Sequence, residues 1–308
     1  MKLSVIVPTH NPHPERLRRT VDALRAQTLA GENWEMVLVD NASEPPLSPG
    51  VLSAGFPANG RLTSEPEPGL THARRRGLLA NASEWAVFVD DDNLLAPDYL
   101  ENVIRIFSEH PRLGAIGGIV TPDFEIEPEP WMREFDGLLA CRDLGGRPRV
   151  SAGFPDSSTG RNEYPVFAPL GAGLAVRREA IKSWLETQPA ALLPDRQGPQ
   201  LTSAGDNEMI LLAMKAGWEV GYFPELRLTH LIPSTRLNPQ YLARLNRGIQ
   251  RSWMQVLQKY GANPWPLIPR WTVPPRQFRA WFTHRAWAGK AEFVRWQGAC
   301  GHFEGRSQ

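Results

Sequence analysis

Apolar residues along the first two thirds of the chain alternate between strand-like and helix-like patterns. Leu3–Val7, Trp34–Val39 and Trp85–Val89 are short apolar runs rich in β-branched and aromatic residues, which is typical of buried strands. A segment with apolar residues at helical spacing follows each run: Leu17, Val21 and Leu24; Ala73 to Leu79; and Tyr99, Leu100, Val103, Ile104 and Phe107. This order predicts an α/β fold, Rossmann-like, with a doubly wound and mostly parallel sheet.

Two further parts of the pattern extend this prediction. The chain is polar and rich in Pro and Gly between the second apolar run and the second helix, so we expect a loop there. Farther along, Glu219–Phe223 has the composition of another strand, and the helix before it ends at Gly217.

Polar and acidic residues stand at the carboxyl end of each predicted strand. Pro8 and Thr9 follow the first strand, Asp40 the second and Asp90–Asp92 the third. Because the carboxyl ends of parallel strands meet at one edge of a sheet, we expect these side chains to lie close together. Three adjacent carboxylates repel one another, and oxygen ligands suit Mg²⁺ or Mn²⁺, so the triplet predicts a metal site for substrate phosphates. The alternative is a solvated acidic turn before the helix that begins near Asp98.

The composition predicts a soluble globular protein that stays inside the cell. Hydrophobic residues make up 42% of the 308 positions and charged residues 22%. Cys141 and Cys300 have no Cys or His at ligand spacing, which favours a reducing compartment over a zinc or disulfide framework. No apolar run approaches the roughly 18 residues of a membrane-spanning helix, and Pro8 stops the first run too early for a secretion signal. We therefore expect a cytoplasmic protein, either free or at the inner face of the membrane.

The net charge of +1 hides a strong asymmetry between two parts of the chain. Residues 231–308 contain 12 Lys and Arg but 2 Asp and Glu, whereas residues 1–230 contain 22 and 31. Six of the 11 tryptophans also lie in this carboxyl-terminal part. A basic, Trp-rich tail on an acidic body suggests two parts with different partners.

The pattern of apolar residues in this tail predicts helices. Asn238 and Pro239 begin a helix with an apolar stripe, formed by Tyr241, Leu242, Leu245, Ile249, Trp253, Val256, Leu257 and Tyr260. Prolines then interrupt the chain, and a Trp/Arg-rich helix is expected at about 276–297. Two interpretations remain open: an interfacial helix on an anionic membrane, or a helical cap over an acceptor cleft. Nucleic-acid binding is disfavoured because no recognised motif accompanies the charge.

Several motifs occur in the order and at the spacing of one known family. They are Ser4-Val-Ile-Val-Pro-Thr-His-Asn11, Val37-Leu-Val-Asp-Asn-Ala-Ser43, Pro68-Gly-Leu-Thr-His-Ala-Arg-Arg-Arg-Gly77, Phe88-Val-Asp-Asp-Asp-Asn93, Gly171-Ala-Gly-Leu-Ala-Val-Arg-Arg178, Gly205-Asp206 and Pro224 to His230. Over roughly residues 3–232 the chain resembles the family 2 glycosyltransferases, which have the GT-A fold. The resemblance implies a GT-A catalytic domain at residues 1–232 and a basic, helical carboxyl-terminal region at 233–308.

The resemblance also implies a nucleotide-sugar site and a divalent cation, Mg²⁺ or Mn²⁺. The residues that it assigns to the nucleotide sugar are Pro8, Thr9, His10, Asn11, Asp40, Asn41, Gly69, Arg74, Asp90 and Asp91. Asp40 would accept hydrogen bonds from the base or ribose, unless it only forms a turn with Asn41. The cation would be held by Asp90 and Asp92, and by His230, for which a purely structural role remains open.

On the acceptor side, the resemblance implies roles for Trp131, Gly171 and Gly173. The indole ring of Trp131 suits stacking on a sugar, but a core position is an equal alternative. The family's processive members carry Gln-x-x-Arg-Trp where this chain has Gln250-Arg-Ser-Trp253. The resemblance with this departure implies that one sugar is added per encounter.

The general base is assigned to Asp206 by its register. The family places this carboxylate at the start of a helix, eleven residues before a glycine, and Asp206 lies eleven residues before Gly217. Gly205 departs from the family pattern, where an acid is common, and this puts acceptor contacts in doubt. The alternative is that Asp206 only caps its helix.

Together these observations predict an inverting, metal-dependent enzyme of polysaccharide or cell-envelope biosynthesis. It would transfer a single sugar from a nucleotide-diphosphate sugar, with UDP expected as the carrier, to a hydroxyl of a glycan, lipid-linked or other acceptor. Two alternatives are a sugar-nucleotide nucleotidyltransferase and a non-catalytic nucleotide- or sugar-binding module. The first normally needs a Gly-rich basic loop after the first strand, where this chain has Pro8-Thr-His-Asn-Pro12.

Overall fold

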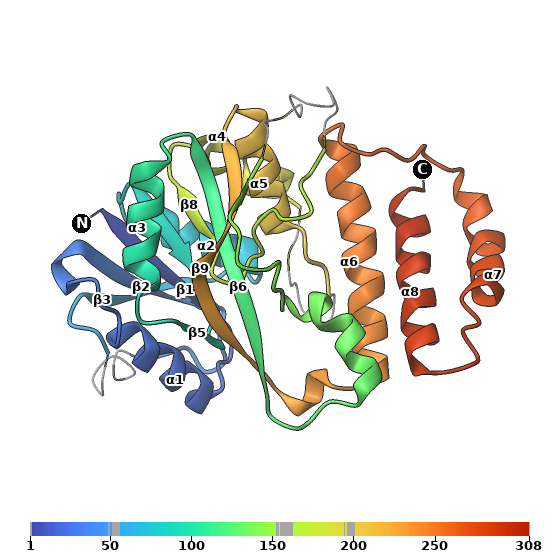
Figure 1. Ribbon diagram of the computed structural model, residues 1–308, viewed down its shortest axis with the longest axis horizontal. Helices are drawn as coiled ribbons and strands as arrows, with labels where there is room; N and C mark the ends of the chain where they lie inside the picture. Colours follow the sequence, from blue (N-terminus) through green and yellow to red (C-terminus); the bar gives the residue numbers. More distant parts are fainter. Residues whose placement is uncertain are drawn as a thin grey trace.

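The computed structural model describes residues 2–48, 50, 56–151, 154, 163–193, 195 and 201–307. Within these residues nine strands form one mixed sheet in the order β3-β2-β1-β4-β8-β6-β9-β5, with β7 paired to β9 (Figure 1). The strands are β1 (Leu3–Thr9), β2 (Trp34–Asn41), β3 (Gly60–Glu65), β4 (Trp85–Phe88), β5 (Asn93–Leu95), β6 (Leu113–Phe124), β7 (Arg149–Val150), β8 (Ala175–Arg177) and β9 (Glu219–Ile232). The α-helices are α1 (Pro14–Arg25), α2 (Leu70–Leu79), α3 (Tyr99–Glu109), α4 (Lys182–Glu186), α5 (Gly205–Lys215), α6 (Pro239–Lys259), α7 (Val273–Thr283) and α8 (Lys290–Gly305).

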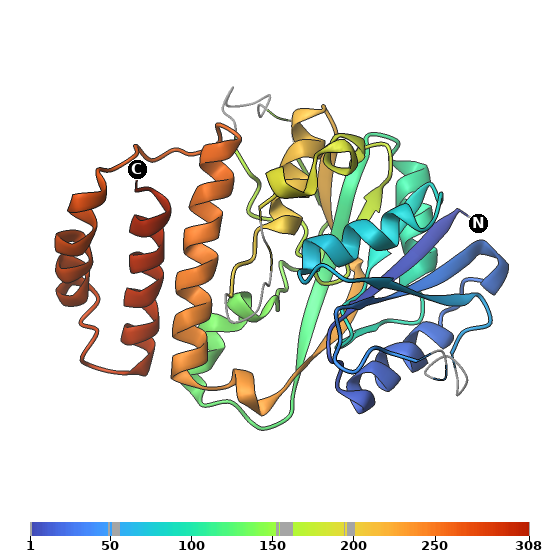
Figure 2. The same ribbon diagram turned by 180° about the vertical axis from the view of Figure 1, so that it is seen from behind.

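The amino-terminal half of the sheet has the predicted doubly wound arrangement. β1 pairs in parallel with both β2 and β4, and β3 pairs in parallel with β2. Successive β1 side chains point to opposite faces: Val5 and Val7 pack with α1 and α3, whereas Ile6 packs with α2 and α5. Figure 1 accordingly shows α1 and α3 on one face, and Figure 2 shows α2 on the other. The predicted fold class is confirmed.

The expectation of a loop between β2 and α2 is wrong in part, because this segment contains β3. The strand lies parallel to β2 at the edge of the sheet, with Gly60 opposite Met36. Most of its side chains are half-buried, because β3 is the edge strand of the sheet and pairs with β2 along one side. It therefore lacks the continuous apolar run that marks a central parallel strand.

Two long paired strands, β6 and β9, cross the middle of the molecule. β9 was expected at Glu219–Phe223 but continues for 14 residues. Its parallel pairing with β6 shifts register at Gly118, where a Cβ atom would lie 2.0 Å from the Leu226 carbonyl oxygen. Beyond this shift β9 pairs with β5 so that His230 lies opposite Asn93. The length of β9 thereby brings His230 beside the acidic triplet.

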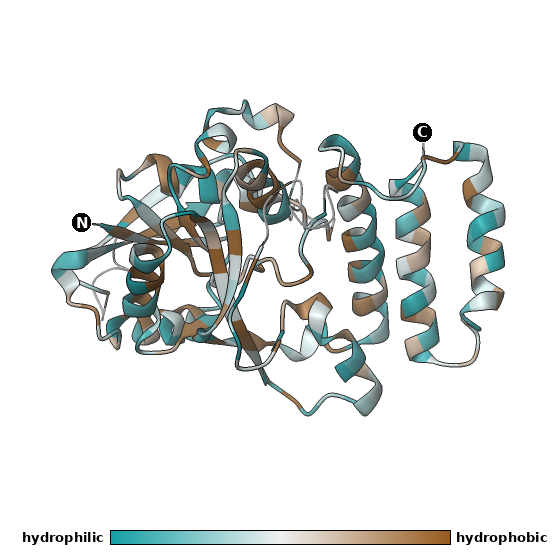
Figure 3. Ribbon diagram, turned by 45° about the horizontal axis from the view of Figure 1, so that its top comes forward, coloured by the Kyte–Doolittle hydropathy of each residue, from teal (hydrophilic) through white to brown (hydrophobic). Residues whose placement is uncertain are grey.

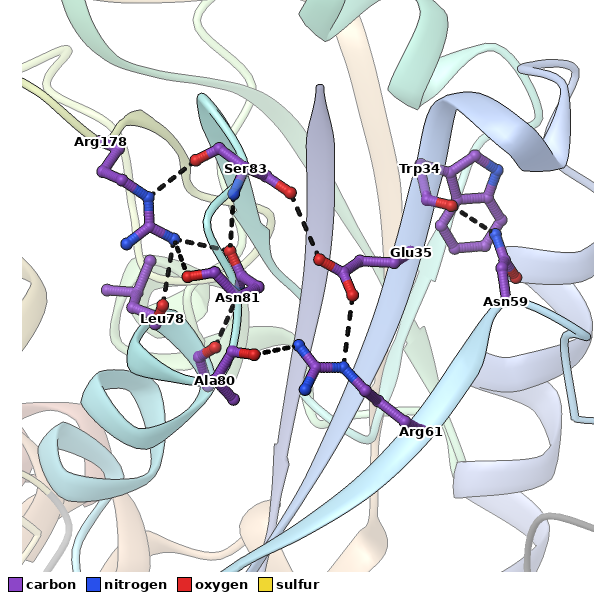
Figure 4. A network of polar contacts seen from close by, with 10 residues as sticks. Trp34, Glu35, Asn59, Arg61, Leu78, Ala80, Asn81, Ser83 and Arg178 are labelled. Atoms are coloured by element: carbon purple, nitrogen blue, oxygen red, sulfur yellow. Dashed lines mark hydrogen bonds and ion pairs between the residues drawn. The ribbon is translucent and has the colours of Figure 1, made fainter. Parts of the chain in front are cut away.

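A polar network closes the opposite end of the sheet, at the turn between α2 and β4 (Figure 4). Arg178 Nε donates to the Ser83 carbonyl at 2.7 Å, and Nη2 donates to the Leu78 carbonyl at 3.0 Å. The Glu35 carboxylate accepts from Ser83 Oγ and from Arg61 Nε, both at 3.3 Å. These bonds join α2 to three strands, which fixes the helix that forms one wall of the site described below.

The carboxyl-terminal region is a row of helices beside the sheet (Figure 1). α6 contacts α5 and the 3₁₀ segment η3 (Pro130–Leu139), α8 packs on α6, and α7 packs on α8 at the outer edge. The single helix expected at about 276–297 is wrong, since α7 ends at Thr283 and α8 begins at Lys290. Between them Arg285 has a left-handed φ of 50°, which an α-helix cannot continue through.

The distribution of apolar residues agrees with this layering. Figure 3 shows them gathered on the central strands. In the described part of the chain, no helix combines the length and the hydropathy that crossing a membrane requires.

A buried glutamate anchors the row of helices to the sheet domain. Glu208 of α5 is fully buried and accepts a hydrogen bond from Lys259 Nζ at 2.5 Å and one from Tyr260 Oη at 2.7 Å. Its second oxygen accepts from the Leu193 backbone N–H at 2.8 Å. A buried carboxylate without these donors would be costly, so the end of α6 must stay against α5.

We predict that Glu208→Ala lowers the free energy of unfolding by roughly 3 kcal/mol, because it leaves the half-buried Tyr260 Oη and the Leu193 N–H without their acceptor and removes the carboxylate partner of Lys259. Chemical denaturation monitored by far-UV circular dichroism measures this change. Glu109→Ala is the matched control, since Glu109 forms an exposed pair with Arg105 and its loss should cost less than about 0.5 kcal/mol. Equal losses in both variants would contradict an anchoring role for Glu208.

Candidate active site

A cleft of about 570 Å³ opens at the carboxyl ends of β1, β2 and β4, where the sequence predicts the site. Its walls come from this edge of the sheet, from α2 and α5, and from the first turns of α6. The predicted residues on its lining are Pro8, Thr9, His10, Asn41, Gly69, Arg74, Asp90, Asp91, Asp92, Gly171, Asp206 and His230. Pro8 and His230, which are 222 positions apart in the sequence, thus lie on one surface.

The ends of β1 and β4 are joined by a side-chain hydrogen bond. Thr9 Oγ1 donates to Asp91 Oδ2 across these strands. Next to it, His10 Nδ1 lies 2.7 Å from the Asn41 carbonyl oxygen, which fixes the imidazole ring at the end of β2. The middle carboxylate of the triplet is therefore turned back toward β1.

Asn41 holds the loop that leads into α2. Its Nδ2 donates to the carbonyls of Glu65 and Glu67 at 3.1 and 2.6 Å, and its Oδ1 accepts from the Gly69 N–H at 2.8 Å. Gly69 has φ 139°, a conformation that L side chains rarely adopt, and it precedes the first turn of α2. The amino terminus of α2 is consequently presented to the cleft, where the positive end of the helix favours an anion, although the Leu70 N–H already donates to the Asp195 carbonyl at 3.1 Å.

Asp40 and Asn11 lie outside the cleft lining. The Asp40 carboxylate is buried and accepts from the backbone N–H groups of Ser43 and Leu47 at 3.3 and 2.8 Å. Asn11 Oδ1 accepts from the Glu44 N–H at 2.8 Å. Both side chains thus shape the loop after β2, which is the turn-forming role that the sequence left open for Asp40.

The third carboxylate of the triplet lies between two basic side chains. Asp92 Oδ1 is 3.4 Å from His230 Nε2, and Asp92 Oδ2 accepts from Arg236 Nη2 at 3.2 Å. Arg236 Nη1 also lies 3.2 Å from His230 Nε2, while His230 Nδ1 is 2.9 Å from the Leu139 carbonyl oxygen. The Leu139 carbonyl therefore orients the ring so that Nε2 faces Asp92, as carbonyl groups do for metal-binding histidines.

The pKa values of Asp91 and Asp92 are shifted in opposite directions. Burial alone raises the pKa of Asp92, but the charges of His230 and Arg236 more than offset it and lower the pKa to about 2. Burial and the negative charge of Asp92 raise the pKa of Asp91 to about 6, and the hydrogen bond from Thr9 offsets only part of this rise. Asp92 is therefore a firm anion, whereas Asp91 gains a proton in mildly acidic solution.

Arg74 and Asp206 face each other across a glycine. The buried Arg74 guanidinium lies 3.6 Å from Asp90 Oδ1 and 5.3 Å from the centre of the Phe88 ring. A Cβ atom on Gly171 would be 2.9 Å from Arg74 Nη2 and 2.7 Å from Asp206 Oδ2. Only glycine leaves room for both side chains here, so Gly171 sets the distance between the arginine and the carboxylate.

Asp206 lies in the first turn of α5 and is almost fully buried. Its Oδ1 accepts from the N–H of the next residue, Asn207, at 2.8 Å, and the N-cap position is taken by Ala204. A Cβ atom on Gly205 would lie 2.5 Å from Thr71 Oγ1 and 3.2 Å from Asp195 Oδ2. The glycine is thus required by packing, and Asp195 places a carboxylate beside it.

The model of the glycosyl transferase family 2 matches residues 4–184 of this sequence. The chain belongs to glycosyl transferase family 2. Among curated relatives, it is 29% identical over 148 residues to the glucosyl-dolichyl phosphate glucuronosyltransferase of Haloferax volcanii, an alignment that covers 47% of each chain. The chain therefore spans about half the length of this relative. Family membership favours glycosyl transfer over the nucleotidyltransferase and over the non-catalytic module.

Solved glycosyltransferase structures share the fold over nearly the whole chain. S. aureus TarS 1–349 in complex with UDP has a TM-score of 0.52 and 15% identity, and the match covers 98% of this chain and 89% of that one. The mannosyltransferase PcManGT from Pyrobaculum calidifontis, in complex with GDP-Man and Mn²⁺, has a TM-score of 0.56 and 19% identity, with 97% and 73% covered. At these identities the likeness establishes the GT-A fold alone.

Two of the residues assigned to the acceptor side of the glycosyltransferase lie away from the cleft lining. Trp131 packs edge-on against Phe135 within η3, with ring centres 5.9 Å apart. Gly173 has φ 70°, and its carbonyl accepts a hydrogen bond from Tyr99 Oη at 2.6 Å. Gly173 continues into β8, so the expected acceptor loop is partly a strand.

Few side chains of the cleft lie close enough together to act as ligands of one metal ion. Among the residues that the structure describes, no group of three or more His, Cys, Asp or Glu side chains is arranged to hold a metal ion. Asp92 and His230 alone present an oxygen and a nitrogen at 3.4 Å from each other. Any cation here would take its remaining ligands from the substrate and water, as Mg²⁺ commonly does in phosphate sites.

The lining also contains polar residues that the sequence did not mark as part of a site, among them Arg236, Asp195 and Tyr241. Arg236 lies 144 positions from its partner Asp92, in a short 3₁₀ turn with no motif of its own. Tyr241 was recognised only as part of the apolar stripe of α6. A signal that could have found Arg236 is its place directly after the strand that carries His230.

The raised pKa of Asp91 predicts a pH dependence of stability. The folded protein holds this proton up to about pH 6 while the unfolded chain releases it near pH 4, so the stabilisation present below pH 4 is lost as the pH rises through 6. Relative to Asp91→Asn, the wild type should lose about 3 kcal/mol of unfolding free energy between about pH 3.5 and 7.5. Denaturant titrations of both proteins at the two pH values, without divalent metal, measure it. Parallel pH profiles for the two proteins would contradict the shift.

Proposed function

We propose that this protein transfers a single sugar from a nucleotide-diphosphate sugar to a hydroxyl of a glycan, lipid-linked or other acceptor, with inversion at the anomeric carbon. The observation that supports this best is the pair of charges that face each other across Gly171. Arg74 and Asp206 lie in one cleft with the acidic triplet, and we assign Arg74 to the diphosphate and Asp206 to the acceptor hydroxyl. An inverting displacement needs this separation of leaving-group and base chemistry.

The donor is proposed to bind along the carboxyl ends of β1, β2 and β4. The amino terminus of α2 and the Arg74 guanidinium offer hydrogen-bond donors and positive charge to the diphosphate. Relatives of the same fold bind UDP and GDP-Man, which supports a nucleotide sugar, and we propose UDP as the carrier. His10 and Asn41 would contact the nucleoside from the end of β2, with Pro8 and Thr9 below it.

A divalent cation, Mg²⁺ or Mn²⁺, is proposed to be held by Asp92 and His230, with Asp90 beside them and the substrate and water as its remaining ligands. Asp92 is fully ionised, and the hydrogen bond to the Leu139 carbonyl already turns His230 Nε2 toward it. A bound cation would stabilise the charge of the departing diphosphate as a Lewis acid. The Mn²⁺ in the mannosyltransferase of the same fold supports this assignment.

Asp206 is proposed as the general base. The carboxylate oxygen that accepts from the Asn207 N–H is Oδ1, and Oδ2 is the atom nearest to Gly171 and Arg74. Oδ2 thus lies on the side of Gly171, and we propose that the acceptor hydroxyl meets the sugar beside this atom.

The acceptor is proposed to enter between the loop after η3 and α6. Leu139 and Ala140 line one side, and Tyr241 and Leu245 of α6 line the other. The cap interpretation of the tail is thereby supported for α6. We propose residues 1–232 as the catalytic domain and 233–308 as an extension that completes its acceptor side; a location in the cytoplasm remains a prediction.

Asp206→Asn should reduce transfer by roughly two to four orders of magnitude while nucleotide binding survives. The amide keeps the size of the side chain and still accepts from Asn207, but it cannot take a proton. Product formation from a panel of labelled donors measures transfer, and NMR of the product gives the anomeric configuration. Asp98→Asn is the matched control, because Asp98 also lies at the amino-terminal end of a helix, as the N-cap residue of α3, but is outside the cleft lining. Near-normal turnover in Asp206→Asn would place the base elsewhere, and a retained configuration would exclude single displacement.

Asp92→Asn should abolish turnover and the rise in melting temperature that UDP with Mn²⁺ produces in the wild type. The variant removes the one carboxylate that faces both His230 and Arg236. Thermal-shift assays with UDP alone, Mn²⁺ alone and both together separate nucleotide binding from cation binding. A wild type that works fully in EDTA would refute the cation.

A further inference from the structure

The outer side of α7 exposes a continuous aromatic surface, formed by Phe278, Phe282 and Trp287 and called here the outer aromatic surface. Their exposed fractions are 67%, 54% and 56%. The ring centres of Phe278 and Phe282 are 5.1 Å apart, and those of Phe282 and Trp287 are 5.6 Å apart. Trp271, just before the helix, is 77% exposed. Large apolar side chains grouped this way in water mark an interaction site.

α7 is held in place mainly by other side chains, although the Trp287 ring also lies 6.3 Å from that of Trp281. The helix is fixed from its other side, where Val273 and Ala280 are buried and Trp281 packs edge-on against Trp296 of α8 at 4.7 Å. Trp296 Nε1 also donates to the Gln277 carbonyl at 3.0 Å. Figures 1 and 2 show α7 at the outer edge of the row of helices, with α6 and α8 between it and the sheet. The outer aromatic surface is therefore free for a partner.

The charge around this surface has one sign. Residues 261–291 include Arg270, Arg276, Arg279, Arg285 and Lys290 but no Asp or Glu. All five basic side chains are exposed. Among the described residues, Arg279 and Arg285 have no carboxylate within ion-pair distance, whereas Lys290 pairs with Glu129 at 2.8 Å. A partner for this surface must offer an apolar region for the aromatic rings and negative charge for the basic side chains.

We propose that the outer aromatic surface docks onto an anionic lipid bilayer. Phenylalanine and tryptophan rings enter the headgroup region of a bilayer, and neighbouring arginines pair with anionic headgroups. A second copy of the chain fits poorly, because two such surfaces would bring like charges together. Docking through α7 leaves the cleft, on the far side of α6, open to substrates. The inference is independent of the proposed sugar transfer.

The test is co-sedimentation of the full chain with vesicles of equimolar phosphatidylglycerol and phosphatidylcholine, without sugar substrates. The wild type should bind these vesicles at low salt and be released as the salt rises. Its partition coefficient on pure phosphatidylcholine vesicles should be lower by more than about tenfold. Combined Phe278→Ser, Phe282→Ser and Trp287→Ser should reduce the partition coefficient more than about 30-fold. Arg279→Ala with Arg285→Ala should reduce it about 30-fold.

Matched controls replace exposed residues elsewhere. Leu79→Ser and Val166→Ser remove apolar side chains that are 58% and 86% exposed, and Arg147→Ala removes an exposed charge, so these variants should bind like the wild type. Unchanged melting temperatures show that the α7 variants fold. No binding by the wild type at low salt, or equal binding by the aromatic triple variant, overturns the proposal. Self-association in sedimentation velocity that the triple variant abolishes would instead assign the surface to a second copy.

Discussion

Three neighbouring carboxylates cannot share a largely buried turn unless positive charge surrounds them, and the architecture around the cleft satisfies this constraint. Arg74 reaches Asp90 from α2, while His230 and Arg236 reach Asp92 from the end of β9 and the turn after it. Thr9 supplies the hydrogen bond to Asp91. Each of these elements has to be in register with β4, so the sheet order and the length of β9 are part of the site. The charge balance and the topology are therefore a single requirement.

The same requirement explains why the carboxyl-terminal helices belong to the site. The turn that carries Arg236 leads directly into α6, whose first turns place Tyr241 and Leu245 on the cleft. Glu208 holds the other end of α6 against α5 through Lys259 and Tyr260. The helix is thus fixed at both ends, at its start through the pair of Arg236 with Asp92 and at its end through the buried Glu208. A catalytic domain that ended at residue 232 would lack one wall.

Whether a strand or a site residue could be predicted from the sequence depends on whether local contacts determine its position. β1, β2 and β4 were predictable because central strands buried on both faces must be apolar throughout. The position of Asp206 followed from its distance to Gly217, whose φ of 91° indeed ends α5. β3 was missed because an edge strand needs no such run. Arg236 and Asp195 were missed because contacts between distant segments place them, and no local pattern encodes these contacts.

Arg236 also has a thermodynamic consequence for ligand binding at the site. Its guanidinium already serves as an internal counterion for Asp92, so a divalent cation that approaches this carboxylate must compete with it. Such competition weakens the apparent affinity for the free cation. A diphosphate that arrives together with the cation gives the released guanidinium a new anion, and each ligand then strengthens the other. Under the proposed function, linkage would make the cleft bind the cation and the diphosphate together more tightly than either ion alone.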